Sequence, residues 1–561
     1  MKTFINSYKF GTCLVSAVLL LTACTKNFGD MNTDPNLVTK PNMKFLFTFT
    51  ADKLRPSGTE WIWESLEQLM RYTQQVSASP YELSGSINTR YRTYYADILP
   101  NLVEIRHQID QEQDKDRYQK MGAVTYILGV YYGIRVTDMN GSIPYSEAIL
   151  ARYEDKFDPL FDTQQTLFTQ WLGELDRAIQ VLSDASLLNQ ESYGDADIFY
   201  QSDWAKWIKL ANTLKLRIAA RLENQDSEAT RRIFQQVMQD AIGPIDGDET
   251  QLQYLNPTDA FLGADVDYRS RRYASRQMVR FMKKSDDPRI RIYFDQNDLT
   301  GSFRDTLAKY NVQLPAFIDP DDPLVMYQGG PADWTTDQSI TQWMSNPFQV
   351  SQYSRYFLIS PVNRLFLSPK LNGATGNTLH ILVSYAETCF YISEFIEKGY
   401  GAGIDTKGSV SDWYNKGIAS SIRTMNEVAR EAGSTMAFTG DGTGEIEAYQ
   451  QRPEVALGAG NDLERIYIQA YLSLFRLPNE AYVLCRRTGY PRNESAYYPM
   501  ESFHEPIPRR FGIGDPGEVN RANWEQAYQE QGFTPRAVDA QTLSQERVWY
   551  DKNAPAFGAG D

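Results

Sequence analysis

Apolar residues recur every three or four positions over several long stretches of the chain. One such series contains Phe168, Trp171 and Leu175, and this spacing is typical of an amphipathic helix. Asp162 and Gln165 stand where they would cap the start of that helix. The same spacing predicts helices in 121–135, 204–222, 379–397, 414–428 and 463–475. The pattern therefore predicts a mainly α protein.

The predicted helices occur in pairs, which favours a stacked helical scaffold of the solenoid kind. No strict repeat of about 34 residues supports this interpretation. We expect the scaffold to occupy about 45–240 and 379–490, and loop-rich parts to occupy about 240–378 and 490–561. Long irregular segments in a compact protein are usually functional or disordered. Here their density of Tyr, Trp and Phe argues against disorder.

The N-terminus predicts the cellular compartment. Lys2 and Lys9 precede an apolar run over 13–21, which is shorter than the roughly 20 residues that span a bilayer. This arrangement is typical of a secretory signal. The sequence Leu-Thr-Ala-Cys that ends at Cys24 resembles the lipobox of bacterial lipoproteins, in which the chain is cut before an acylated Cys. The alternative is an ordinary signal peptide with a chance Cys.

Under the lipoprotein interpretation, residues 1–23 are the signal peptide and Cys24 carries the lipid. Residues 24–41 then form a polar, turn-rich leader. By its length the chain could hold more than one domain. No later stretch is apolar enough to cross a membrane, so we expect a tethered protein and not an integral one.

The charge balance excludes one class of partner. The chain carries a net charge of −15, and loss of residues 1–23 removes two lysines and no acid, which leaves −17. Nucleic-acid binding needs a basic face, so we expect no nucleic-acid partner. Cys389 and Cys485 remain in the mature chain, and two buried thiols are favoured over one disulfide because no dense Cys framework is present.

Several motifs have some features of catalytic or metal sites. Residues 512–517 match the literal G-x-G-x-x-G string, but no predicted strand precedes them and Asp515 would face a phosphate, so we interpret them as a turn. Two acidic runs lack the spacing of a calcium loop: Asp246, Asp248 and Glu249, and Asp319, Asp321 and Asp322. His380 and His504 have no His or Cys at ligand spacing. We therefore expect no metal, no cofactor and no catalytic residue.

A series of strings in a fixed order resembles the SusD/RagB family of outer-membrane nutrient-binding lipoproteins. The strings are Phe28–Asn36, Tyr94–Asn101, Gly141–Tyr145, Trp204–Arg217, Asp287–Arg289, Tyr385–Glu387 with Glu394, Tyr414–Ile418, Glu480–Tyr482, Arg486–Pro491 and Pro508–Arg510. Ser142 replaces the usual Asp of the turn at 141–145, and Ser393–Phe395 stands where the family often has Ala-Glu-Ala. Most of these residues belong to the scaffold, where Arg217 and Arg289 suit the binding of carboxylates and carbonyls.

The resemblance implies a single mainly α domain over 24–561, with tetratricopeptide-like helix pairs as scaffold, long irregular loops packed over them and few short strands. It also implies a non-enzymatic cell-surface lipoprotein of the outer membrane that captures nutrient for a SusC-type, TonB-dependent barrel. Aromatic rings suit sugars and peptides alike, and we favour oligosaccharide over oligopeptide. Two other classes stay open. One is a surface glycan-degrading enzyme, because carboxylate pairs meet in space and not in sequence, and the other is a structural lipoprotein without a ligand.

Ligand-binding rings should be aromatics that helix packing does not explain, on loops beside polar and turn residues. Three places fit this description, and their candidate residues are Tyr81, then Tyr268 and Tyr273 with Arg271, then Tyr327 and Trp334. Trp334 is the first choice, because it has the largest face and Gly329 and Gly330 would let a ligand approach the backbone. The alternative for each ring is that it packs its own loop.

Overall fold

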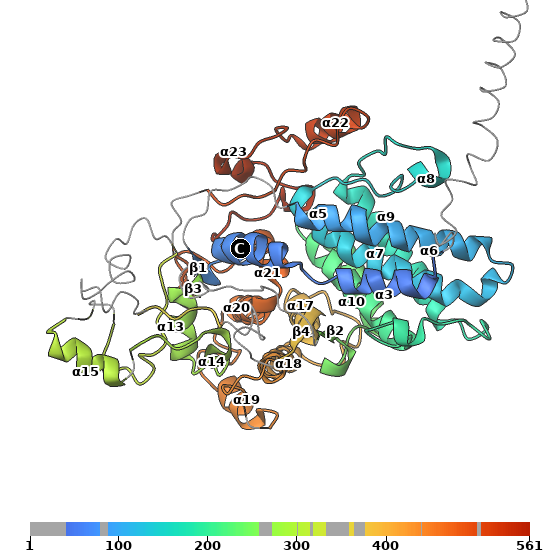
Figure 1. The fold of residues 1–561 in the computed structure, drawn as a ribbon. Helices are drawn as coiled ribbons and strands as arrows, with labels where there is room; N and C mark the ends of the chain where they lie inside the picture. The colour runs from blue at the N-terminus through green and yellow to red at the C-terminus, as the bar shows by residue number, and fades with distance from the viewer. Residues whose placement is uncertain are drawn as a thin grey trace, which may run out of the picture.

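The structure is a computed structural model that describes residues 41–78, 88–256, 272–299, 301–312, 314, 318–332, 358–363, 376–438, 440–501 and 506–560. Helices dominate these residues (Figure 1), which confirms the predicted mainly α class. Four short strands form two antiparallel pairs, β1 (Val76–Ala78) with β3 (Arg272–Ala274) and β2 (Leu252–Asn256) with β4 (Thr378–Val383). In the described part of the chain, no helix combines the length and the apolar character needed to cross a bilayer.

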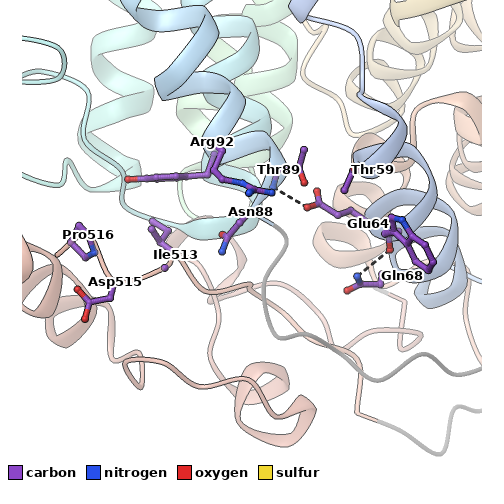
Figure 2. A pocket seen from close by; sticks show the side chains of 12 residues that line it. Thr59, Glu64, Gln68, Asn88, Thr89, Arg92, Ile513, Asp515 and Pro516 are labelled. Atoms are coloured by element: carbon purple, nitrogen blue, oxygen red, sulfur yellow. Dashed lines mark hydrogen bonds between the residues drawn. The ribbon is translucent and has the colours of Figure 1, made fainter. Parts of the chain in front are cut away.

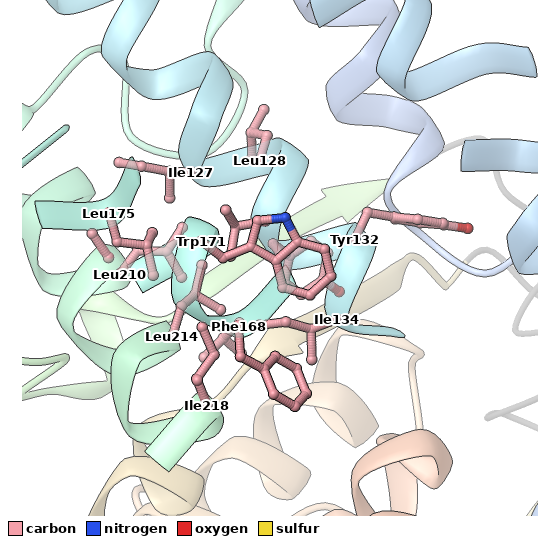
Figure 3. Close-up of a cluster of buried hydrophobic side chains, with 14 of the residues drawn as sticks. Ile127, Leu128, Tyr132, Ile134, Phe168, Trp171, Leu175, Leu210, Leu214 and Ile218 are labelled. Carbon is pink, nitrogen blue, oxygen red and sulfur yellow. The ribbon is translucent and has the colours of Figure 1, made fainter. Parts of the chain in front are cut away.

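The N-terminal half is a layer of helices packed side by side. Its main helices are α3 (Met43–Lys53), α5 (Thr89–Thr93), α6 (Leu99–Gln111), α7 (Gln119–Asn140), α9 (Gln164–Ser183), α10 (Trp204–Leu222) and α11 (Ser227–Gln239), with the short α4 (Met70–Tyr72) and α8 (Ala151–Glu154). Along the chain, α7 packs on α9, α9 on α10 and α10 on α11. Figure 3 shows Trp171 of α9 enclosed by side chains of α7 and α10, among them Leu128, Tyr132 and Leu210.

Local sequence explains where these helices begin. Asp203 caps α10, because its carboxylate accepts hydrogen bonds from the backbone N–H groups of Ala205 and Lys206. The prediction that Asp162 caps α9 is wrong: Thr163 is the cap. The Asp162 carboxylate instead accepts from the backbone N–H groups of Tyr145 and Ser146 at 2.9 and 2.8 Å. Asp162 therefore binds the backbone of the loop at Tyr145 and Ser146 instead of capping α9.

The C-terminal half contains a second core. The helices of this half are α13 (Arg276–Lys284), α14 (Ile290–Tyr293), α15 (Gly301–Lys309), α17 (Tyr385–Glu397), α18 (Val410–Glu431), α19 (Thr443–Gln450), α20 (Asp462–Ser473), α21 (Pro478–Thr488), α22 (Arg521–Gln531) and α23 (Ala540–Gln545). Among them, α22 packs through Trp524 on the core of the N-terminal half, and α15 packs through Phe303 in a separate small cluster. The prediction of helix from residue 379 is wrong for its first turn, because strand β4 precedes α17. The predicted loop-rich parts also contain helices, namely α13, α14, α15, α22 and α23.

Buried arginine–carboxylate pairs join the two halves. Arg217 of α10 donates to both oxygens of Glu387 on α17 and to the carbonyl of Leu382. Within the C-terminal half, Arg289 binds both oxygens of Asp287 with the same bidentate geometry. The prediction that Arg217 and Arg289 hold carboxylates and loop carbonyls is thus confirmed for Arg217, and for Arg289 as far as the carboxylate. The planar guanidinium suits this geometry, because its parallel N–H groups match the two carboxylate oxygens.

Candidate functional site

A cavity of about 580 Å³ opens where three distant segments of the chain meet. We call it the Trp63 cavity. Its lining residues are Thr59, Trp63, Glu64 and Gln68, then Asn88, Thr89, Tyr91 and Arg92, then Ile513, Gly514, Asp515 and Pro516. Figure 2 shows Glu64 and Gln68 on one side, and Ile513 and Asp515 on the other. The Trp63 cavity is larger in volume than two other cavities of the described structure, which measure about 330 and 340 Å³.

The first wall is a π-helical segment, Glu60–Leu69, that is fastened to the start of α5. One oxygen of Glu64 accepts a hydrogen bond from the backbone N–H of Thr89 at 2.9 Å, and the other pairs with Arg90 at 3.1 Å. Burial raises the pKa of the Glu64 carboxyl, and the guanidinium of Arg90 opposes that rise. Glu64 is therefore a buried residue whose hydrogen bond and ion pair connect two walls of the cavity.

Two buried carbonyl oxygens at this cavity lack a hydrogen-bond donor among the described residues. They are the side-chain oxygens of Gln68 and Asn88. Gln68 uses its amide N–H group on the backbone carbonyl of Trp63 at 3.1 Å. Asn88 stands at the cap position of α5 but makes no capping bond. A buried polar atom without a partner costs about 1–3 kcal/mol. Both oxygens lie below the cavity surface, so a ligand that brings O–H or N–H donors would bind them only once the amide groups turn toward the cavity.

An aromatic surface lies beside these two acceptors. Trp63 is 38% exposed although it belongs to a helical segment whose other residues are buried. Tyr91 is half-buried and lines the same cavity. Burial raises the pKa of the Tyr91 hydroxyl, so this ring stays neutral. An exposed indole beside polar acceptors can hold a flat apolar face and orient the polar groups at its edge.

The third wall is the Gly-rich segment that contains Asp515. Asp515 pairs with Arg521 at 3.2 Å and also with Arg536. The backbone N–H of Gly517, then Arg536, lower the pKa of its carboxyl. No strand leads directly into 512–517, and α22 begins only at Arg521. This arrangement agrees with the rejection of a nucleotide-binding loop. Arg92 is exposed and has no ion pair within the described ranges.

The predicted ligand-binding residues do not line this cavity where the structure describes them. Tyr273 is buried on β3, where it pairs with Ser77. Tyr327 is buried in the second core. Neither ring offers a face to a ligand in this conformation. The remaining candidates, Tyr81, Tyr268, Arg271 and Trp334, and the lipidation candidate Cys24, lie outside the described residues, and their roles stay predictions.

The space expected at Gly329 and Gly330 is occupied by the chain itself. A Cβ at Gly329 would lie 2.4 Å from the backbone of Arg276, and one at Gly330 would lie 2.7 Å from the hydroxyl of Ser77. These glycines therefore permit α13 and β1 to pack closely against their loop. Trp63, Gln68 and Asn88 were missed because the sequence interpretation sought aromatics on loops, and Trp63 belongs to an apolar helical pattern.

The remaining candidate groups have partners of their own. Asp246 pairs with Lys209 at 2.6 Å, Asp248 with Arg423 at 2.7 Å and Asp322 with Lys283 at 2.7 Å. Among the described residues, no three His, Cys, Asp or Glu side chains are grouped as metal ligands. Cys389 and Cys485 are free, buried thiols, as predicted, and burial raises the pKa of both.

Comparison with known proteins gives one family and many similar folds. A family described as "Starch-binding associating with outer membrane", of the SusD-like type, matches residues 35–513. A chitin-binding protein has a similar structure, with a TM-score of 0.67 and 22% identity, over 91% of this chain and all of the other chain. A chitin-binding SusD homolog from Flavobacterium johnsoniae gives 0.63 and 19%, over 92% of this chain and all of its own.

A SusD homolog from Bacteroides fragilis is also similar, with a TM-score of 0.62 and 20% identity, over 91% of this chain and 99% of its own. No match was found among the curated proteins. At these identities the structural likeness shows the fold alone, and it confirms the predicted SusD-like architecture.

Proposed function

Because the chain belongs to the SusD-like family, we propose that it is a cell-surface lipoprotein that captures oligosaccharide and delivers it to a SusC-type, TonB-dependent barrel of the outer membrane. The observation that carries the ligand class is the Trp63 cavity, in which an exposed indole lies beside two unsatisfied carbonyl acceptors. The lipobox-like sequence ending at Cys24 supports the anchor. The family's association with the outer membrane supports the location.

The chemistry of the cavity suits a neutral sugar. The apolar face of a pyranose ring can lie flat on the indole of Trp63, while hydroxyl groups at the ring edge donate to the oxygens of Gln68 and Asn88 once these buried amides turn toward the cavity. An N-acetyl group also brings an N–H donor. Two of the similar structures are named chitin-binding, which makes chitin oligosaccharides the first ligands to test.

Oligopeptide is the second candidate, and one observation favours it. Arg92 is exposed at the cavity without an ion pair among the described residues, so it is free to bind a C-terminal carboxylate. Backbone N–H groups of a peptide would also satisfy Gln68 and Asn88. A titration that compares neutral chitin oligosaccharides with short peptides separates the two ligand classes.

A glycan-degrading activity fits the cavity less well. Glycoside hydrolysis uses two carboxyl groups free to exchange protons or to attack. Both carboxylates that line the cavity are engaged, Glu64 with Arg90 and Asp515 with Arg521 and Arg536. We therefore expect no release of reducing ends when the purified protein is incubated with chitin or starch oligosaccharides.

Isothermal titration of the Trp63→Ala variant tests the proposed site. For the wild type we expect micromolar to millimolar affinity for an oligosaccharide, or roughly −4 to −8 kcal/mol. Loss of the indole should weaken binding at least about tenfold, which corresponds to about 1.4 kcal/mol. Tyr310→Ala is the matched control, because its ring is 39% exposed but lies at the end of α15. Equal affinity of Trp63→Ala and Tyr310→Ala would remove Trp63 from the site.

A further inference from the structure

The first helix after the leader, α3, has two apolar faces. The inner face packs in the core through Phe47, Ala51 and Leu54, which are fully buried. The ring of Phe47 stacks on Tyr193 with centroids 3.7 Å apart. The outer face carries Phe45 and Phe49, which are 76% and 45% exposed. Because residues four apart lie on the same side of a helix, these two rings form one exposed aromatic strip.

Packing within the chain does not explain this strip. The helix is already held by its inner face and by the hydroxyl of Thr48, which donates to the carbonyl of Ala196. Isolated exposed apolar residues are ordinary, whereas neighbouring ones mark a surface that meets another apolar phase. The only other pair of exposed large apolar residues within five positions of each other in the described chain is Phe157 with Leu160, and these lie in the loop before α9.

Two lysines of α3 lie next to the strip, although the whole chain is acidic. Lys44 is exposed next to Phe45, and the ammonium of Lys53 lies 5.1 Å from the ring centroid of Phe49. The one acid of α3, Asp52, pairs with Arg55 at 3.2 Å. Aromatic residues flanked by lysines are typical of helices that lie in a membrane interface, where the rings enter the acyl boundary and the ammonium groups meet phosphates.

The position of α3 along the chain points to the same surface. Residues 25–42 separate Cys24 from Met43, so full extension spans at most about 65 Å at ~3.3–3.6 Å per residue. A flexible chain of this length has a mean end-to-end distance of about 25 Å. A lipid on Cys24 would therefore keep α3 close to the bilayer, and the short tether would make a weak surface contact intramolecular.

We propose that the outer face of α3 docks on the lipid headgroup layer of the membrane in which the protein is anchored, with Phe45 and Phe49 inserted and Lys44 and Lys53 on the phosphates. This inference rests on the proposed anchor at Cys24. Docking would fix the orientation of the body on the membrane, which a single point of attachment at Cys24 does not. The lipid and the helix would then act as the two signals that stable membrane attachment requires.

Vesicle flotation of the unlipidated chain that starts at Thr25 tests the proposal, since this chain keeps every described residue. The vesicles contain phosphatidylcholine, alone or mixed with phosphatidylglycerol. We expect the wild type to float with the mixed vesicles, and Phe45→Ser/Phe49→Ser to partition at least tenfold less. The Trp double variant at these positions should keep the wild-type partition. The control is Val519→Ser/Val538→Ser, which removes exposed apolar residues beside α22 and α23.

Three results of the flotation experiment would overturn the proposal. They are a wild type that does not float, a Ser variant that floats like the wild type, and a control that loses as much as the Ser variant. A wild type that forms dimers through Phe45 and Phe49, seen by sedimentation, would assign the strip to a second copy instead. Oligosaccharide titration on the same variants should be unchanged, because α3 does not line the Trp63 cavity. A wild type that does not bind oligosaccharide would therefore contradict the proposed function and leave this inference intact.

Discussion

Trp207 provides the sharpest test of how the scaffold is held together. Its side chain is fully buried near the start of α10, and its indole N–H donates to the Asp197 carboxylate at 2.8 Å. The same carboxylate accepts from the backbone N–H groups of Ser202 at 2.9 Å and Phe199 at 3.1 Å. The ring also meets Tyr200 edge-on with centroids 5.1 Å apart. Trp207 thus fills a core position and satisfies a buried charge.

Two substitutions separate these contributions. Trp207→Phe keeps a ring but removes the donor to a charged acceptor, which should lower the free energy of unfolding by about 1.5–3 kcal/mol. Trp207→Ala also leaves a cavity, and we expect a loss of at least about 3–5 kcal/mol. Trp204→Ala is the matched control on the same helix, and its smaller loss should follow from its half-buried position. Urea denaturation followed by circular dichroism measures all three.

The pH dependence adds a second readout. Burial raises the pKa of Asp197, while hydrogen bonds from Ser202 and Trp207 oppose the rise. The indole N–H stabilises the ionised form, so the destabilisation of Trp207→Phe should be largest at neutral pH and shrink as acid protonates Asp197. A variant with unchanged stability and lost oligosaccharide binding would refute this reasoning and place Trp207 in the site.

Three further outcomes are expected. Exchanging residues 1–24 for a cleavable signal without the Cys24 anchor should leave the fold intact and move most of the protein out of the outer-membrane fraction, and full retention there would contradict the anchor. Trp334→Ala should weaken oligosaccharide binding in a titration, and an unchanged affinity in a well-folded variant would leave Tyr81 as the next candidate. Burial penalises the Glu480 carboxylate, but Arg217 and Arg221 overcome this and hold its pKa at about 2. Because that pKa lies below the unfolded value, the ionised Glu480 stabilises the folded state by roughly 3 kcal/mol above about pH 4.5, and this contribution is lost as pH falls towards 2. The Glu480→Gln variant should therefore show a flatter dependence of stability on pH in this range, as measured by acid unfolding.

Helices with strong local signals were predictable from sequence. The stripe over 204–222 matches α10, because its apolar period and the Asp203 cap act within a few residues of each other. Strand β4 was not predictable in the same way. Its run of apolar residues over 378–383 fits a buried helix or a buried strand, and its partner β2 lies more than a hundred residues earlier. The hydrogen bonds to the distant strand β2 make this segment a strand and not the start of a helix.

The site was harder to predict than the fold because its chemistry is assembled from segments far apart in the sequence. Trp63 has the spacing of a core residue, and only the tertiary arrangement leaves its ring exposed. Asn88 has the residue type of a helix cap, yet its side chain makes no cap, and its oxygen is buried at the cavity without a partner. Conversely, Tyr273 and Tyr327 have the turn-rich context of binding residues but are buried in the described structure.

The Gly-rich wall shows how the scaffold shapes the cavity. The backbone N–H of Phe511 donates to the carbonyl of Met139 at 2.7 Å, and the amide of Asn140 donates back to the carbonyl of Phe511 at 3.1 Å. The backbone N–H of Ile513 donates to the hydroxyl of Tyr528 at 2.7 Å. The wall is therefore fixed to the end of α7 and to α22, two helices that do not line the cavity. A cavity held in this way is preorganised, so ligand binding need not order the wall, and a few hydrogen bonds and one stacked ring can suffice for capture.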